Sequence, residues 1–73
     1  GMYDLVIANI SSKVIIDLAE YIVTALVRGG TIILSGILEE QQAGVLDRLS
    51  ELGVTVKDTM TDTDWVALVA TTP

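Results

Sequence analysis

The amino-acid sequence predicts an α/β domain in which a mainly parallel sheet ends in an antiparallel hairpin, with the element order β-α-β-α-β-β. Short apolar runs alternate with longer segments of helical periodicity, a pattern typical of strands joined by crossover helices. The last third of the chain has two strand-like runs, a turn between them and no helical pattern. We therefore expect two right-handed strand–helix–strand units followed by a hairpin.

The first expected strand covers Tyr3–Ile10, and the run Leu5–Ala8 is apolar at every position. A continuous apolar run is typical of a strand that is covered on both faces. Ser11 or Ser12 suits the N-cap of a helix that we expect from about Ser12 to Val27. The apolar side chains of that helix recur as one stripe, which consists of Ile15, Leu18, Ala19, Ile22 and Leu26.

A glycine pair is expected to end this first helix. Gly29 and Gly30 suit the left-handed geometry of a C-cap, and Arg28 suits the negative end of the helix dipole. The second expected strand, Thr31–Ser35, is short and rich in β-branched residues, and Gly36 follows it.

The second helix is expected to begin near Glu39 and Glu40, where a helix N-terminus favours negative charge, and to stop at Gly53. Its helical spacing is carried by Leu38, Gln42, Val45, Leu46, Leu49 and Leu52. Gly44 lies inside this helix and marks either a close packing contact or a tolerated exposed position.

The last two strands differ in their expected burial. Val54–Asp58 alternates apolar and polar residues, which is typical of an edge strand. Trp65–Ala70 is apolar on both faces, and Thr61–Asp64 forms the turn between the two. We therefore expect the last strand inside the sheet and the Val54 strand at its edge.

This order of elements leaves one face of the sheet without cover. If the sheet grows in one direction through two right-handed crossovers, both helices lie on the same face. The first strand is also an unguarded edge, since Leu5–Ala8 contains no Pro or Lys. We expect a part of a larger α/β domain or a homo-oligomer that associates through the uncovered face or the first-strand edge.

The amino-acid composition argues against several classes of function. The 73 residues suffice for one small domain and contain no Cys and no His, so His-based triads, thiolate nucleophiles and the usual zinc sites are excluded. Four basic against ten acidic residues give a net charge of −6, which disfavours direct nucleic-acid binding. No apolar run approaches the roughly 20 residues of a membrane span. We expect a cytoplasmic protein with no membrane partner and no metal site.

Several segments together resemble one known family. They are Val6–Ile10, the pair Gly29-Gly30, Leu34–Leu38, a Gln at 41 or 42, and Asp64–Leu68. At these spacings the chain resembles the C-terminal part of the bacterial methyltransferases of large-ribosomal-subunit protein eleven, which belong to the class I fold. Three departures from the family pattern are Ser11-Ser12 after the Asn, Arg28 in place of Pro, and Asp64 in place of Glu.

The resemblance implies a partial Rossmann-like methyltransferase fold that uses S-adenosyl-L-methionine to methylate amines of a ribosomal protein. The family's glycine-rich cofactor loop, GxGxG, does not occur here. Residues 1–73 would therefore form a single partial domain, the C-terminal half of the fold, and this piece alone is expected to be inactive. The alternative hypothesis is a non-catalytic α/β self-association module.

Four residues are candidates for the site, and none is assigned a catalytic role. By resemblance Asn9 binds the cofactor, although an Asn there also suits a cap of the following helix. Ser35 and Gly36 close the next strand on the same rim and are candidates for substrate binding, with turn geometry as the alternative. Trp65 is either a substrate-facing platform or a core residue.

Overall fold

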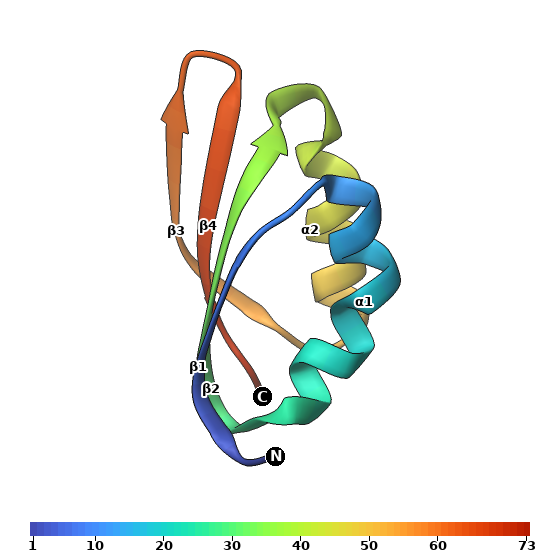
Figure 1. The fold of residues 1–73 in the computed structure, drawn as a ribbon, viewed down its shortest axis with the longest axis vertical. Helices are drawn as coiled ribbons and strands as arrows, with labels where there is room; N and C mark the ends of the chain where they lie inside the picture. Colours follow the sequence, from blue (N-terminus) through green and yellow to red (C-terminus); the bar gives the residue numbers. More distant parts are fainter.

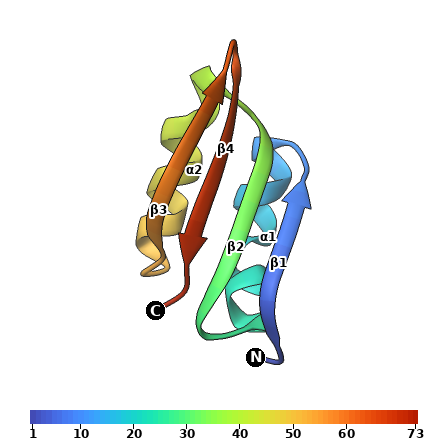
Figure 2. The same cartoon turned by 90° about the vertical axis from the view of Figure 1, so that its left-hand side faces the viewer.

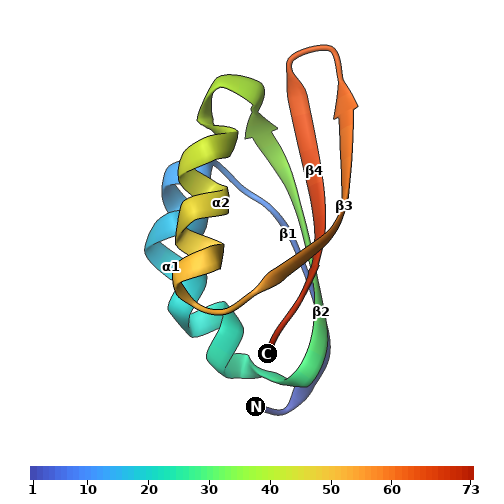
Figure 3. The same cartoon turned by 180° about the vertical axis from the view of Figure 1, so that it is seen from behind.

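The computed structural model describes residues 1–73 and shows a four-stranded sheet with both helices against one of its faces (Figures 1 and 3). The elements are β1 (Tyr3–Asn9), α1 (Ser12–Ala25), β2 (Leu26–Leu38), a 3₁₀ turn (Glu39–Gln41), α2 (Gln42–Glu51), β3 (Thr55–Asp62) and β4 (Trp65–Thr71). Neither helix has the length and apolar character that crossing a lipid bilayer requires.

The strands lie in the order β1-β2-β4-β3 (Figure 2). β1 pairs with β2 in parallel, whereas β4 pairs in antiparallel fashion with both β2 and β3. The expectation of a mainly parallel sheet is therefore wrong, and the sheet is mixed. The reason is that β4 returns from the hairpin turn and inserts between β2 and β3, which confirms its expected interior position and makes both of its contacts antiparallel.

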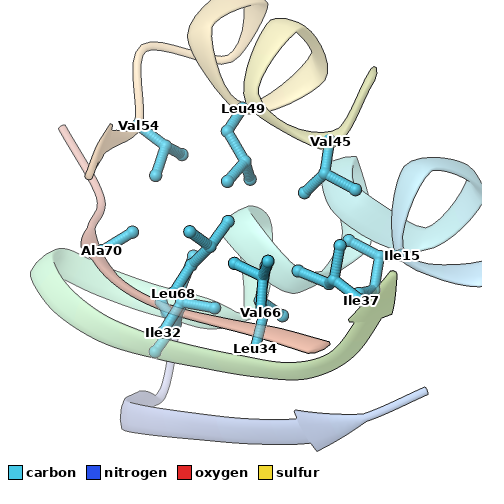
Figure 4. Packing of buried hydrophobic residues seen from close by; sticks show 11 residues of the cluster. Ile15, Ile32, Leu34, Ile37, Val45, Leu49, Val54, Val66, Leu68 and Ala70 are labelled. Atoms are coloured by element: carbon cyan, nitrogen blue, oxygen red, sulfur yellow. The ribbon is translucent and has the colours of Figure 1, made fainter. Parts of the chain in front are cut away.

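The core lies between the sheet and the two helices (Figure 4). Alternate residues of β2 and β4 face the helices, so the paired residues Leu34 and Leu68 are 1% and 0% exposed. The helices contribute Ile15 of α1 together with Val45 and Leu49 of α2. The complete cluster is Ile15, Leu26, Ile32, Leu34, Ile37, Val45, Leu49, Val54, Val66, Leu68 and Ala70.

The first helix ends earlier than its sequence predicts. α1 stops at Ala25, and the C-cap residue Leu26 already has an extended backbone. Leu26 is 4% exposed and pairs with Tyr3 of β1, so strand pairing and burial override the helical stripe. Gly29 and Gly30 consequently lie inside β2 and do not cap the helix.

The second helix also begins later than expected. Glu39 and Glu40 form the 3₁₀ turn, and α2 starts at Gln42. The expected stop is confirmed, because α2 ends at Glu51 and Gly53 adopts a positive φ of 75°. Gly44 is exposed, and an ideally placed Cβ there would lie 3.6 Å from Ile16 Cδ1, so the position tolerates a small side chain.

Thr72 ties the end of the chain to the start of β2. Its hydroxyl donates to the carbonyl of Val27 at 2.8 Å and accepts from the N–H of Gly30 at 2.9 Å. The N–H of Thr72 donates to the carbonyl of Gly30 at 2.9 Å. Because Thr72 is only 6% exposed, these bonds replace contacts with water.

Substitution of Thr72 tests this connection. Thr72→Val removes the hydroxyl and leaves two backbone groups of β2 without a partner, so we expect the free energy of unfolding to fall by about 1–3 kcal/mol. Thr72→Ser keeps the hydroxyl and should cost clearly less. Urea denaturation followed by circular dichroism measures both, and equal losses for the two variants would contradict the assigned role of the hydroxyl.

Candidate functional site

The candidate site lies at the rim where β1 and β2 reach their carboxyl ends. Asn9 is the last residue of β1 and pairs with Ser35 of β2. In open α/β sheets, ligands bind beyond the carboxyl ends of parallel strands. The parallel pair β1–β2 therefore presents Asn9 at the edge of the sheet where a ligand is expected.

The carboxamide of Asn9 is exposed and does not cap α1. Ser11 is the N-cap, and its hydroxyl accepts a bond from the N–H of Val14 at 3.4 Å. No side-chain hydrogen bond of the chain involves Asn9. The helix-cap alternative for Asn9 is therefore wrong, and its donor and acceptor atoms are available to another molecule.

Gly36 lies directly against Asn9. It has a positive φ of 81°, and the β2–β4 register shifts between Leu34 and Ile37. An ideally placed Cβ at Gly36 would lie 2.6 Å from Asn9 Oδ1 and 3.3 Å from the carbonyl oxygen of Ile10. The expected end of the second strand at Ser35 and the turn alternative are therefore wrong, because β2 continues through Gly36 to Leu38. The shift of register within the strand brings Gly36 into contact with the Asn9 carboxamide.

Ser35, Gly36 and Trp65 line one hollow of about 180 Å³. Trp65 is 53% exposed, so the alternative core position of this side chain is wrong. It lies opposite Leu38 of β2, where β4 enters the sheet next to the hairpin turn. The other residues of the hollow are Met60, Thr61, Asp62, Val66 and Ala67.

A second hollow at the same end of β2 is acidic. Glu39, Glu40 and Asp64 line it together with Leu38, and the N–H of Glu39 donates to the carbonyl of Asp64 at 2.8 Å. The ion pairs of the chain all involve Arg48, so these three carboxylates have no cationic partner. No group of His, Cys, Asp or Glu side chains is arranged to hold a metal ion.

The sequence did not indicate that these carboxylates belong together. In the sequence, Glu39 and Glu40 suit a helix N-terminus, and Asp64 belongs to the turn Thr61–Asp64. The pairing of Leu38 with Trp65 brings the two segments to one place, although they are distant in the sequence. Local sequence patterns carry no signal for such a contact.

An apolar groove follows the outer edge of β1. It is lined on the strand by Tyr3, Leu5 and Ile7, and Leu5 and Ile7 are 48% and 66% exposed. α1 contributes Leu18 and Tyr21. We call this surface the edge groove, since it continues from the unpaired edge of β1 onto the side of α1.

Comparisons with known proteins identify close relatives. The family described as "Ribosomal protein L11 methyltransferase (PrmA)" matches residues 1–73. The protein named ribosomal protein L11 methyltransferase of a Caulobacter species is 45% identical over 71 residues, which are 97% of this chain and 25% of that protein. The protein of the same name from Agrobacterium fabrum is 43% identical over 68 residues, which are 93% and 23% of the two chains.

A solved structure of a protein with a similar name has the same fold over most of this chain. The crystal structure of the ribosomal protein L11 methylase from Lactobacillus delbrueckii subsp. bulgaricus superimposes with a TM-score of 0.89 and 28% identity. The match covers 92% of this chain and 35% of that chain. The present chain thus spans about a quarter of the length of the curated relatives it matches.

The exposure of Trp65 leads to a stability prediction. Leu68→Ala removes a fully buried side chain and should lower the free energy of unfolding by about 2–5 kcal/mol. Trp65→Ala removes a half-exposed side chain and should cost clearly less. Urea denaturation compares the two variants. Since Trp65 is the only tryptophan, its fluorescence should also be quenched efficiently by acrylamide in the folded chain, and strong protection would contradict its placement at the rim.

Proposed function

Because the chain belongs to the ribosomal protein L11 methyltransferase family, we propose that it forms the C-terminal half of a class I, Rossmann-like fold that methylates amines of a ribosomal protein. S-adenosyl-L-methionine is the proposed methyl donor. The observation that carries the proposal is the Asn9 carboxamide, which is exposed at the carboxyl end of β1 and has no bond within the chain. Reported relatives are named as methyltransferases and give no support to a non-catalytic association module.

The residues at the rim fit one side of such a site. Asn9 offers a donor and an acceptor, which suits a ligand with polar groups of both kinds, and we propose that it binds the cofactor. When bound, S-adenosyl-L-methionine supplies the electrophilic methyl group. The chain has no GxGxG segment, so we propose that the remaining cofactor contacts come from other parts of the family's fold.

We propose that the hollow beside Asn9 receives the substrate. Ser35 and Gly36 line it, Gly36 lies against Asn9, and Trp65 is half-exposed and offers an aromatic surface. Together they would orient an amine-bearing segment and reduce its contact with water, which lowers the entropic cost of the reaction. This role does not require any of the three side chains to take part in bond making.

The charge at the rim favours a basic protein as the partner. Glu39, Glu40 and Asp64 have no cationic partner in the chain, and the net charge is −6. Such a surface attracts positively charged groups and repels the phosphates of nucleic acids. We therefore propose a ribosomal protein in the cytoplasm, and not RNA, as the molecule that approaches this rim.

A further part of the proposal concerns the edge groove beside β1. Leu5 and Ile7 are exposed large apolar residues, and the outer edge of β1 is unpaired. We propose that the portion of the family's fold outside the matched segment covers this surface. In its absence, the same surface joins two copies of the chain.

A chimera tests the proposed function. Residues 1–73 replace the matching segment of the Caulobacter relative, and methyl transfer from labelled S-adenosyl-L-methionine to ribosomal protein L11 is measured. We expect the chimera to be active. Asn9→Ala should lower its methyl-transfer activity about tenfold or more, because a positioned hydrogen bond is lost. The isolated chain should show no micromolar binding of S-adenosyl-L-methionine in isothermal titration.

The controls separate folding from function. Thr59→Ala changes an exposed residue of β3 that lines neither hollow and should leave the chimera's activity unchanged. Full activity of the Asn9→Ala chimera would contradict the role of Asn9. A folded wild-type chimera without activity, with native circular dichroism, would contradict the proposal as a whole.

The proposed contact surface is tested by substitution in the isolated chain. Ile7→Lys places a charge on the edge groove and should shift the chain toward the monomer, because removal of the exposed apolar surface from water is what stabilises association. Multi-angle light scattering measures the mass. Thr59→Lys, on the opposite edge strand, is the matched control. A wild-type chain that stays monomeric at high concentration would show that the surface does not join copies.

A further inference from the structure

Two glycines of β2 share an unusual backbone but differ in their surroundings. Gly29 and Gly36 have positive φ values of 72° and 81°. No atom lies within 4 Å of an ideally placed Cβ at Gly29. At Gly36 the same Cβ would lie 2.6 Å from Asn9 Oδ1, closer than real Cβ contacts.

A side chain at position 36 therefore meets two separate obstacles. The first is the positive φ, which is costly for any residue with a Cβ and which Gly29 shares. The second is the Asn9 carboxamide, and it occurs only at Gly36. The Cβ would also lie 3.3 Å from the backbone carbonyl oxygen of Ile10, so a second group crowds it.

The carboxamide is the group that would yield. Asn9 is exposed, its side chain makes no hydrogen bond within the chain, and Oδ1 is at the flexible end of that side chain. The backbone of Ile10 cannot move as cheaply, because it leads into α1 two residues later. A Cβ at position 36 would thus displace the Asn9 carboxamide and leave the core untouched.

We propose that Gly36 is a positioning residue: the absence of a side chain there sets where the Asn9 carboxamide lies at the rim. Gly36 thereby acts through Asn9 as well as by lining the hollow. The consequence for ligand binding rests on the proposed function of Asn9, whereas the steric relation between the two residues does not.

The steric relation is tested in the isolated chain by NMR. Asn9 is the only asparagine, so labelling with ¹⁵N-asparagine gives a single side-chain amide signal, which Asn9→Ala confirms by its loss. We expect Gly36→Ala to shift this signal and to abolish its nuclear Overhauser effects to residue 36. Gly29→Ala should leave both unchanged. An unshifted signal with retained contacts in Gly36→Ala would overturn the inference.

Stability provides a second measurement with the same variants. Because both substitutions place a Cβ on a backbone of positive φ, we expect Gly36→Ala and Gly29→Ala to lower the urea midpoint by similar amounts. A loss for Gly36→Ala that exceeds the Gly29→Ala loss by more than about tenfold in the unfolding equilibrium constant would show that Gly36 serves packing, and would overturn the positioning role.

The chimera described above measures the consequence for binding. Gly36→Ala and Asn9→Ala should each raise the KM for S-adenosyl-L-methionine about tenfold, and the double variant should be no worse than either single variant, since both act through the same carboxamide. Gly29→Ala should leave the KM unchanged. A displaced Asn9 signal combined with an unchanged KM in Asn9→Ala would uphold the positioning by Gly36 and contradict the cofactor role of Asn9.

Discussion

The structure depends on the double pairing of β2, which lies between a parallel and an antiparallel partner. Its helix-facing residues, such as Leu34, are buried beneath both helices and lie opposite the equally buried Leu68 of β4. The same strand holds β1 through its other edge. Because a shift by one residue would turn every side chain to the opposite face, burial of this apolar set specifies the register on both sides.

That register also builds the rim. It sets Asn9 opposite Ser35 in one ladder and Leu38 opposite Trp65 in the other. Gly36, with its positive φ, lies between these two pairs, where the β2–β4 register shifts between Leu34 and Ile37. Residues from β1, β2 and β4 therefore meet at one end of the sheet, although other elements separate these strands along the chain. The acidic residues at the end of β2 and in the hairpin turn meet there for the same reason.

β1 is buried on one side and exposed on the other, which is consistent with a chain that spans only part of the length of its relatives. One side of β1 packs on the core through Val6 and Ala8, while Leu5 and Ile7 stay exposed on the other. The Leu5–Ala8 run has the composition of a strand buried on both faces. The chain spans about a quarter of the length of its relatives, and a covering partner for this surface is part of the proposed function. The chain also has no GxGxG segment, and the cofactor contacts that such a segment would make are likewise proposed to come from other parts of the family's fold.

The sequence by itself determined the element types and the interior position of the last strand, because apolar periodicity and turn residues are local signals. The site candidates came from their positions at strand ends and from the resemblance to the methyltransferase family. It did not determine where α1 ends, since the burial of Leu26 and its pairing with Tyr3 depend on a strand that lies far away in the sequence. Nor did it reveal the mixed sheet, the exposure of Trp65, the contact between Asn9 and Gly36 or the grouping of Glu39 with Asp64. Those features arise from contacts between residues distant in the chain, and only the packed sheet brings them together.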